Sequence, residues 1–539
     1  MNRLNTFRKD LYNSFFNDQI EVNPSINDSL NLTEYQHLRD RFENSHSVYQ
    51  ESLELDLYEK YLKLVNEIPT TKMNVYDKCL KYYCESYITA NKFNFDLIPM
   101  SPQDNEISFI VESVAGSGSY NFNSKSCYTT FLKKMAIFPE ICDAMITKME
   151  QGIEKKYVLP KIICQKLIDQ LEDIIKLKSY HNKKGSKEFN TKIEELFKPS
   201  INKLVSFLKK VYLPKCRKTI GMLHLPNGKK EYKFLVMQSL SLKNVSIDQI
   251  HSFGVLEVKR ITEMMKIIMK DMGFEGEKND FFKYIRNRKD LQFKNKSEMI
   301  QEYKKMYKKI NDEIMPKLFN DKIKTPCEIL RVPEFNEEYS AEAYYIDGDW
   351  AGKRPGRFYL NMRDISQNSK IEIESLTLHE TIPGHHYQLS LVNESNRIPK
   401  FLKLFGTEAY LEGWALYCEN LGDYETPESY FGKLVLEMIR AIRLVIDTGI
   451  HHYGWNYQKC FNYMKQHGFD TDEQIDQQLI RYICIPTQAL AYKMGEKCMI
   501  ECFKKYVKDS GKDIKEFHTK ILEDGAIPLF ILREKFGLK

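Results

Sequence analysis

The sequence predicts a mainly α fold with a small β-sheet, because a helical period dominates the chain and one short region departs from it. Apolar residues recur three and four positions apart, with lysines between them, in VLEVKRITEMMKIIMKDMGF (255–274). The same spacing, typical of an amphipathic helix, runs through LYEKYLKLVNEI and KIICQKLIDQLEDIIKLK. With 539 residues, of which 42% are hydrophobic, the chain can form several domains or one large helical body.

The exception to the helical period lies between about residues 327 and 361. CEILRV, AEAYYI and GRFYLN are short, rich in β-branched and aromatic residues, and bounded by Pro, Gly and Asp, which favours strands of a small sheet. This region directly precedes the histidine segment described below. We therefore expect a boundary near residue 325, with a mostly helical scaffold over 1–325 and the chemically active region over 326–539.

Charge and cysteine usage narrow the class of protein. The 80 basic and 74 acidic residues leave a formal charge of +6, and lysines alternate with glutamates, so no basic stripe for nucleic acid is expected. No stretch reaches the ~18 apolar residues of a membrane span, and charges interrupt the first residues, unlike a signal peptide. The twelve cysteines are scattered without a C-x-x-C pair, which favours reduced thiols. We expect a cytoplasmic protein with neither nucleic acid nor membrane as partner.

The stretch LTLHETIPGHHYQLSL resembles a metal-binding helix with altered spacing. Zinc peptidases of one large class carry H-E-x-x-H, with two histidines on one helix face and the glutamate as base. Here His379 and Glu380 are in place, but Pro383 occupies the position of the second histidine. Histidines return only at His385 and His386, six and seven positions after the first.

Pro383 and Gly384 offer a way to restore this site. On an unbroken helix His386 returns to the face of His379, but seven residues of about 1.5 Å rise separate the two by roughly 10 Å. A proline removes one helix hydrogen bond and a glycine tolerates the distortion, so a bulge can bring His385 or His386 back beside His379. The alternative is accidental surface polarity. Three of the twelve histidines within eight residues favour metal binding.

A third ligand is expected on the next helix, because a zinc hydrolase uses three protein ligands and one open position. TEAYLEGWALYCENLG carries Glu408, Glu412 and Glu419, and the last two share one helix face. Ordinary helix surface is the alternative for these glutamates. Small and apolar neighbours of Glu412, however, place its carboxylate in a setting where it needs a partner.

HETIPGHHYQ followed by EGWALYCE resembles the family catalogued as domain of unknown function 885, which in turn is similar to the helical zinc peptidases typified by thimet oligopeptidase and angiotensin-converting enzyme. The resemblance covers most of the chain and is weakest over the first ~200 residues; further segments that carry it are IHSFGVLEVKRI, PGRFYLN, IRLVIDTGIHHYGW, PTQALAYKMG and FHTKILEDGAIPL. It implies a helical body split by a deep cleft, with the small sheet beside the zinc-binding helix.

The resemblance also implies a ligand set for one Zn²⁺ ion. H-E-x-G-H with two extra residues makes His385 the second ligand beside His379, with His386 as the alternative. Glu412 becomes the third ligand, and Glu419 a carboxylate that orients a ligating histidine. Ligands of this kind also accept manganese or cobalt.

Catalytic roles follow from the same resemblance. Glu380 is the expected base, taking a proton from water and passing it to the leaving amine. The relatives supply oxyanion donors from a C-terminal helix, and the matching region here is RYICIPTQALAYKMG. Tyr492 is the first choice as donor and Tyr482 the second.

Further residues are candidates for substrate contact or support. Arg481 or Lys493 could bind a substrate carboxylate, although a structural role is equally compatible with the sequence. His451 is a candidate to support the metal site, with a core or capping role as the alternative. GRFYLN stands where relatives place an edge strand that pairs with the substrate main chain. Phe358 and Tyr359 could shape that surface, but packing in the core is the favoured reading.

The leading interpretation is a zinc-dependent metallopeptidase that cleaves short peptides. A second keeps the metal but acts on an amide or a modified amino-acid conjugate, and a third is a non-catalytic helical binding protein. The sequence leaves open the substrate length, exo- against endo-cleavage, and the oligomeric state, a homodimer included.

Overall fold

A computed structural model gives the chain two compact units. Unit 1 comprises Met1–Glu231 and Ile483–Ile485, and unit 2 comprises Tyr232–Tyr482 and Pro486–Lys539. The structure describes residues 3–30, 32–38, 41–103, 107, 125–176, 191–332, 337, 341–350, 352, 354–468 and 471–538. The compact units thus divide the chain near residue 231, and the expected boundary near 325 falls inside unit 2. The functional division into scaffold and active region stays a prediction.

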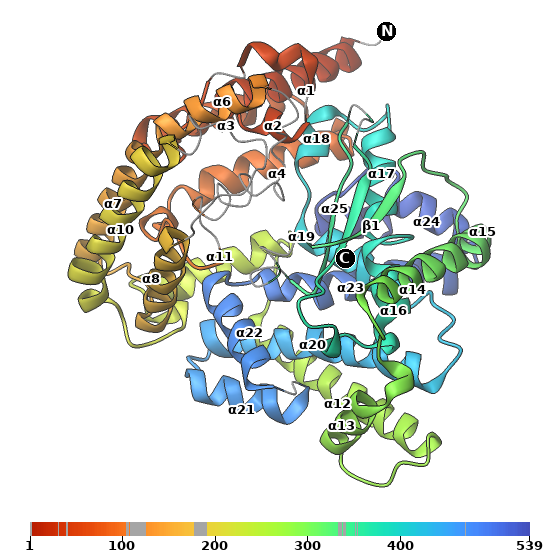
Figure 1. Cartoon of the computed structure of the whole chain (residues 1–539). Coiled ribbons are helices and arrows are strands. Elements are labelled where there is room, and N and C mark those ends of the chain that lie inside the picture. Colours follow the sequence, from red (N-terminus) through yellow and green to blue (C-terminus); the bar gives the residue numbers. More distant parts are fainter. Residues whose placement is uncertain are drawn as a thin grey trace. The chain divides into compact units, whose positions relative to one another are not determined.

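Unit 1 is built from helices that follow one another along the chain (Figure 1). They are α1 (Arg3–Val22), α2 (Ile26–Leu30), α3 (Val48–Val65), α4 (Val75–Ala90), α6 (Lys125–Ala136), α7 (Phe138–Lys155), α8 (Lys161–Lys176), α10 (Lys198–Phe207) and the start of α11 (Gly228–Ser239). Local sequence sets the helix starts: the side chains of Asn74 and Asp77 each accept the other's backbone N–H in a capping box at α4. Aromatic side chains then join the helices, as where Phe15 meets Tyr61 at 4.9 Å between ring centroids.

Unit 2 contains the longer buried helices and the sheet. Its helices are α12 (Ile247–Asp271), α13 (Lys278–Asn287), α14 (Lys296–Lys309), α15 (Met315–Leu318), α16 (Ile373–Glu380), α17 (His385–Glu394), α18 (Lys400–Leu404), α19 (Glu408–Glu419), α20 (Pro427–His451), α21 (Tyr457–His467), α22 (Asp472–Cys484), α23 (Gln488–Phe503), α24 (Ile514–Leu522) and α25 (Leu529–Lys535). α12 packs along α20, and α19 packs along α23.

Two glycines allow α19 and α23 to approach closely. A Cβ atom at Gly495 would lie 1.9 Å from the carbonyl oxygen of Ala409, and one at Gly413 would lie 2.3 Å from the Gly495 backbone. No larger side chain fits at this crossing, so glycine fixes the distance between the helices. The crossing matters for the site because Glu412 directly precedes Gly413.

The predicted small sheet has three strands in the order β1-β3-β2. β1 (Cys327–Arg331) pairs parallel with β3 (Gly356–Leu360), and β2 (Ala343–Ile346) pairs antiparallel with β3. The expectation that GRFYLN forms an edge strand is wrong, because β3 is central and both of its hydrogen-bonding edges are occupied. The edge strand that contacts α16 and α17 is β2.

The two aromatic residues of β3 support the sheet rather than a substrate surface. Phe358 is fully buried in a core cluster and meets Tyr303 edge-to-face at 5.6 Å. Tyr359 stacks on Tyr344 of the neighbouring strand at 5.1 Å. The proposed substrate contact by Phe358 and Tyr359 is therefore replaced by the packing role.

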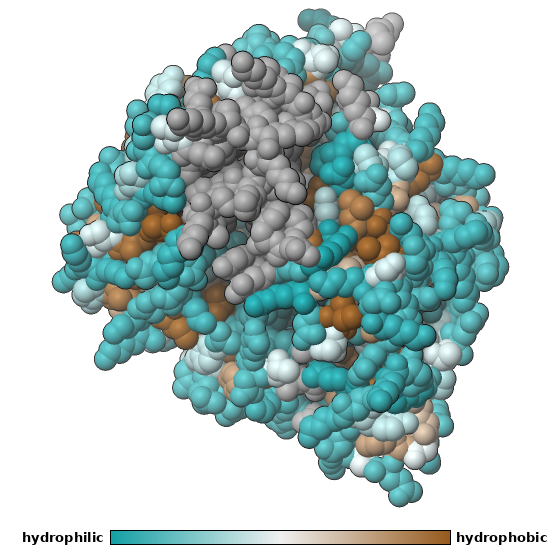
Figure 2. Space-filling model, viewed as in Figure 1, coloured by the Kyte–Doolittle hydropathy of each residue, from teal (hydrophilic) through white to brown (hydrophobic). Residues whose placement is uncertain are grey.

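The mainly α fold with a small sheet is confirmed, while the deep cleft stays a prediction. Figure 2 shows a largely hydrophilic surface on the visible face, interrupted by separate apolar patches. Within the described part of the chain, every helix is too short or too polar to cross a lipid bilayer.

Candidate metal centre

The zinc-helix segment is interrupted where the sequence places Pro383 and Gly384. α16 ends at Glu380 and α17 begins at His385, with a cis peptide bond before Pro383. A Cβ atom at Gly384 would lie 1.8 Å from the carbonyl oxygen of His379, so only glycine lets the chain turn back here. Trp414 of α19 donates its indole N–H to the Pro383 carbonyl at 2.8 Å and holds the turn. Sequence reasoning missed this role of the tryptophan.

The turn brings the two predicted histidine ligands together. The rings of His379 and His385 lie 4.9 Å apart between centroids and nearly perpendicular, at 89°. Oε2 of Glu412 lies 3.4 Å from Nε2 of His379 and 3.5 Å from Nε2 of His385. One ligand atom of each residue falls within 4.8 Å of the others.

These distances fit a shared metal ion better than direct hydrogen bonds. A charge-assisted N–H···O bond spans about 2.7–2.9 Å, shorter than either contact. Atoms held at about 2.0–2.1 Å from one tetrahedral ion would lie about 3.4 Å apart. Oε2 of Glu412 is buried without any hydrogen-bond partner, as expected of an atom that serves as a metal ligand. The residues present therefore fit a zinc ion.

The charge states of the cluster also suit a cation. Burial alone would raise the pKa of Glu412, but the two imidazoles lower it well below its ordinary value, so this carboxylate is ionised. Burial lowers the pKa of His379, yet Glu412 and Glu419 outweigh burial and raise it to about 9. A metal ion binding at neutral pH would therefore displace a proton from His379.

Glu419 orients His379. Its Oε1 accepts from Nδ1 of His379 at 2.8 Å, which leaves Nε2 to point at Glu412. Ser375 donates to the other carboxylate oxygen at 2.8 Å, and Arg440 lies 3.9 Å away. Burial raises the pKa of Glu419, but the hydrogen bond from His379 and the charge of Arg440 together lower it below its ordinary value. The carboxylate is thus ionised and held in place.

Glu380 lies beside this cluster and is uncommitted. It is 8% exposed, and no hydrogen bond within the described residues engages its carboxylate. Burial is the largest cause that raises its pKa, and the charge of Glu412 adds to it, against the lowering effect of the imidazoles. Such a carboxylate is suited to take up a proton.

His386 does not join the cluster. Its Nδ1 lies 2.8 Å from the hydroxyl of Tyr345 on β2, and the ring is fully buried. The structure therefore favours His385 over His386 as ligand, because His385 contacts Glu412 whereas the ring of His386 contacts Tyr345. The group of three possible metal ligands found among the described residues contains His385 and not His386.

The two candidate oxyanion donors differ in whether the hydroxyl proton already has an acceptor. Tyr482 donates to Oε1 of Gln478 at 2.9 Å, so its proton is already committed. The Tyr492 hydroxyl accepts from Gln488 at 3.2 Å and from Arg481 at 3.4 Å, and its own proton has no acceptor among the described residues. Burial and the charge of Glu412 raise the pKa of Tyr492, which keeps it protonated near the metal ligands.

Lys493 and His451 contact residues outside the metal cluster. Nζ of Lys493 forms ion pairs with three carboxylates, so the prediction that it binds a substrate carboxylate is wrong; the partners are Glu437 at 2.6 Å, Glu496 at 2.6 Å and Glu257 at 3.1 Å. His451 donates from Nε2 to the backbone oxygen of Tyr482 at 2.9 Å and stacks on Tyr232. These contacts hold the end of α22, and a supporting role of His451 at the metal site stays a prediction.

Arg440 and Arg443 are the polar residues of this region that sequence reasoning passed over. Both are on α20 and both are buried, at 8% and 7% exposed. The signal that could have found them is two guanidinium groups one turn apart in LVLEMIRAIRLVI, a run whose only other charged residue is Glu437. Charges in such a position need a partner or a ligand.

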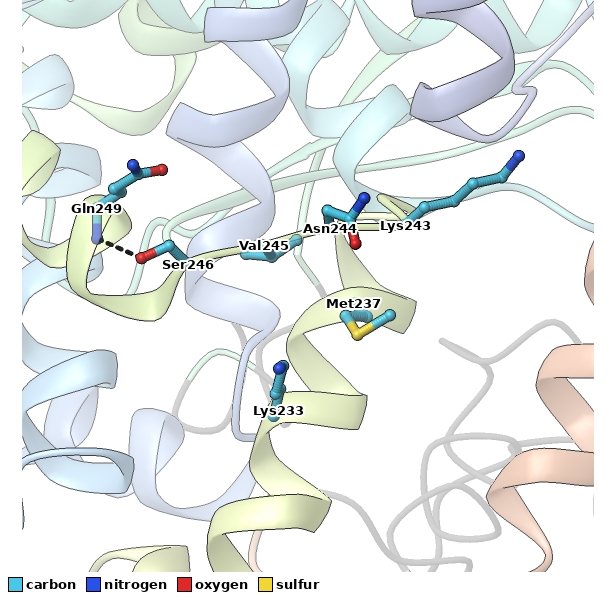
Figure 3. Close-up of a pocket in the computed structure, with 7 residues that line it drawn as sticks. All are labelled: Lys233, Met237, Lys243, Asn244, Val245, Ser246 and Gln249. Carbon is cyan, nitrogen blue, oxygen red and sulfur yellow. Dashed lines mark hydrogen bonds between the residues drawn. The ribbon is translucent and has the colours of Figure 1, made fainter. Parts of the chain in front are cut away.

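A separate pocket of about 440 Å³ lies at the join between α11 and α12 (Figure 3). Its lining includes Lys233, Lys243 and Ser246, and it shares no residue with the metal cluster. Ser246 there accepts the backbone N–H of Gln249, which caps α12.

Two solved structures share this fold. "The putative lipoprotein from Colwellia psychrerythraea" is 20% identical with a TM-score of 0.88, and the match covers 100% of this chain and 99% of that chain. A "putative lipoprotein of unknown function from Shewanella oneidensis" is 17% identical with a TM-score of 0.73, over 97% and 98% of the two chains. At these identities the likeness shows the fold alone.

No curated protein matches the chain significantly. The family described as "Bacterial protein of unknown function (DUF885)" matches residues 28–536, which confirms that part of the resemblance predicted from the two motif segments. Since the match spans nearly the whole sequence, the chain belongs to the DUF885 family.

Proposed function

We propose that the protein is a zinc-dependent hydrolase, most closely a metallopeptidase that cleaves short peptides. The observation that carries the proposal is the convergence of Nε2 of His379, Nε2 of His385 and Oε2 of Glu412 at distances too long for hydrogen bonds and suited to one ion. The similarity of the motif to the thimet-oligopeptidase class of zinc peptidases supports the same reading. Structural zinc sites use four protein ligands, whereas three with an open position are typical of catalysis.

The residues around the ion divide the reaction between them. A zinc ion bound there would lower the pKa of a coordinated water to near neutrality and polarise a substrate carbonyl. Glu380 accepts the proton of the attacking water and later donates it to the leaving amine. Tyr492 donates its free hydroxyl proton to the developing oxyanion, and Tyr482 can do so only by giving up Gln478.

Strand β2 is the element of this site that can align an extended substrate. It is the edge strand next to α16 and α17, and its side chains are half-buried along its whole length. A peptide added to a sheet edge gains main-chain hydrogen bonds whatever its side chains. This arrangement favours a peptide over the alternative substrate class, a small amide of a modified amino acid.

The decisive test compares the zinc-loaded chain with chelator-treated chain on a peptide pool. We expect hydrolysis with zinc, its loss with excess chelator and its return with added zinc. Glu380→Gln should keep zinc, measured by elemental analysis, while turnover falls on the order of 10²- to 10⁴-fold because the base is missing. Full hydrolysis by the metal-free chain would refute the proposal, and a chain that binds no metal at all would favour the non-catalytic binding protein.

A matched control is Glu374→Gln on the same helix. Glu374 accepts backbone N–H groups of Asp423 and Tyr424 at 2.9 and 3.1 Å and makes no contact with the cluster. Its substitution should leave turnover within a few-fold of the unaltered chain. A comparison of turnover on peptides and on N-acyl amino acids separates the peptidase from the amidase. The cytoplasmic location and a homodimer stay predictions.

A further inference from the structure

Arg443 of α20 is a buried cation held in a fixed plane. Its guanidinium carbon lies 4.4 Å from the centroid of the Tyr492 ring, in a cation–π contact. Its Nε donates to the hydroxyl of Tyr482 at 3.2 Å. Both tyrosines are the candidate oxyanion donors, so the arginine lies directly behind the proposed reaction centre.

What Arg443 lacks is an anion. Nη1 is buried with no hydrogen-bond partner, and no carboxylate in the described part of the chain lies within 4.0 Å of its guanidinium. Several other arginines of unit 2 have such partners, as Arg288 has in Asp290 and Glu428. A buried guanidinium without a counter-ion carries a large desolvation cost, which a bound anion would offset.

Arg440, one helical turn before Arg443, also has a guanidinium nitrogen without a hydrogen-bond partner. Its Nε is likewise buried without a partner, while Nη1 donates to the Leu436 carbonyl at 3.1 Å. Residues three apart on a helix share a face, so Arg440 and Arg443 present their free N–H groups to the same side. That side faces the metal cluster, since α20 packs against α16 and Arg440 lies 3.9 Å from Glu419.

Direct contacts place the same pair next to the groups of the proposed site. Arg443 contacts both candidate oxyanion donors, through the ring of Tyr492 and the hydroxyl of Tyr482. Arg440 lies 3.9 Å from Glu419, whose carboxylate accepts from Nδ1 of His379. Each arginine is thus in contact with a residue of the proposed reaction centre or of its support.

We propose that Arg443, assisted by Arg440, binds a carboxylate of the substrate, so that the enzyme prefers peptides or amides bearing a free carboxylate near the scissile bond. This inference rests on the proposed hydrolase function. Guanidinium groups match carboxylates with paired N–H donors, and the stack on Tyr492 fixes the plane in which Arg443 offers them. The carboxylate is either the C-terminal group of a short peptide or the side chain of an acidic residue.

The test uses four tripeptide probes that separate these two sources. They are Gly-Phe-Ala as the free acid, Gly-Phe-Ala amide, Gly-Phe-Asp amide and Gly-Phe-Asn amide. The first two probes test a C-terminal carboxylate, and the last two test an acidic side chain. In one of these pairs, we expect kcat/KM of the zinc-loaded chain for the probe with the carboxylate to exceed that for its neutral partner. The expected ratio is about 10- to 100-fold, as for hydrogen bonds to a charged group. Arg443→Gln should bring this ratio close to one, because it lowers kcat/KM for the carboxylate substrate more than for its neutral partner and does so chiefly through KM, and Arg443→Lys should restore part of the ratio.

A matched control is Arg288→Gln, which removes an arginine already paired with carboxylates and should leave the acid-to-amide ratio unchanged. Calorimetric binding of the free acid and the amide to zinc-loaded Glu380→Gln gives a readout without turnover. Equal kcat/KM for acids and amides, with turnover intact, overturns the carboxylate site and leaves the hydrolase standing. The carboxylate site is also overturned if Arg443→Gln weakens zinc binding but keeps the acid-to-amide ratio. Arg443 would then act only by offsetting the charge of Glu412. No turnover on any probe, with acid still bound tighter through Arg443, overturns the hydrolase instead.

Discussion

Unit 2 contains two groups of charged residues that differ in how closely opposite charges approach one another. In the lysine cluster, defined as Lys493, Lys433, Glu437, Glu496 and Arg260, close opposite charges surround each ion. Nζ of Lys493 lies 2.6 Å from Glu437, and Nζ of Lys433 lies 3.0 Å from the same carboxylate. In the metal cluster of His379, His385 and Glu412, the corresponding distances are 3.4 and 3.5 Å. The first group is closed within the protein, and the second leaves room for one more atom.

This difference separates a structural role from a ligand-binding one. A buried ion pair that satisfies itself fixes the relative positions of helices, here α12, α20 and α23, but has nothing left to offer a ligand. The metal cluster and the neighbouring Arg443 each keep a buried polar atom without a partner. Such atoms are costly unless a ligand completes them, so their clustering beside His379, His385 and Glu412 supports the proposal of a binding site there.

The largest expected effect breaks the closed cluster. Lys493→Met leaves the carboxylates of Glu437 and Glu496 buried without their main counter-ion, and we expect the free energy of unfolding to fall by about 3–5 kcal/mol. Glu412→Gln in the metal cluster should cost only about 1 kcal/mol in the metal-free chain, since it removes no close hydrogen bond. Urea denaturation of both metal-free variants measures the contrast. Equal losses would show that the two clusters do not differ in the way proposed.

Sequence patterns pointed to the three residues of the metal cluster because those residues lie in two short motifs. His379, His385 and the break between them follow from the order H-E-x-x-P-G-H, and Glu412 follows from a second motif on α19. The period of α16 and α19 then places Glu419 on the face of Glu412, seven residues on. Each step uses residues close in sequence, where helix geometry decides direction.

What sequence could not supply depends on contacts between distant segments. The order β1-β3-β2 makes β3 central, and no strand's own composition encodes its neighbours. Lys493 looked like a ligand for a carboxylate because its partners Glu257 and Glu437 come from two other helices. Arg443 was overlooked for the opposite reason. That no carboxylate contacts it becomes evident only when all the segments packed around it are known.

A second prediction concerns Asp447, a buried carboxyl group that has hydrogen-bond donors, unlike Oε2 of Glu412, but no counter-ion, unlike the carboxylates of the lysine cluster. It has neutral donors only: the Tyr232 hydroxyl at 2.5 Å and the Thr487 backbone N–H at 2.8 Å. Burial raises its pKa to about 7 in spite of both hydrogen bonds. Between about pH 4 and 7 the unfolded chain ionises this group while the folded chain does not, so its contribution to stability is full below about pH 4 and lost by pH 7.

Asp447→Asn should remove that pH-dependent component, which is on the order of 4 kcal/mol. The measurement is the free energy of unfolding of both chains at pH steps from 4 to 8. The difference between them should change steadily across the window and level off above pH 7. A difference that is flat with pH would mean that Asp447 is ionised in the folded chain throughout, as the members of the closed cluster are.

The smallest expected effect concerns how the open cluster is held ready for its ion. Glu419 fixes His379 through Nδ1, so Glu419→Gln keeps an acceptor but weakens the hydrogen bond and the basicity it lends to the imidazole. Zinc affinity, measured by competition with a chelating dye, should fall by about 10- to 100-fold, or about 1.4–2.7 kcal/mol. Glu374→Gln should bind zinc as the unaltered chain does. An unchanged affinity for Glu419→Gln would mean that packing alone orients His379, and that the open cluster is preformed by the Gly384 turn without help from a charge.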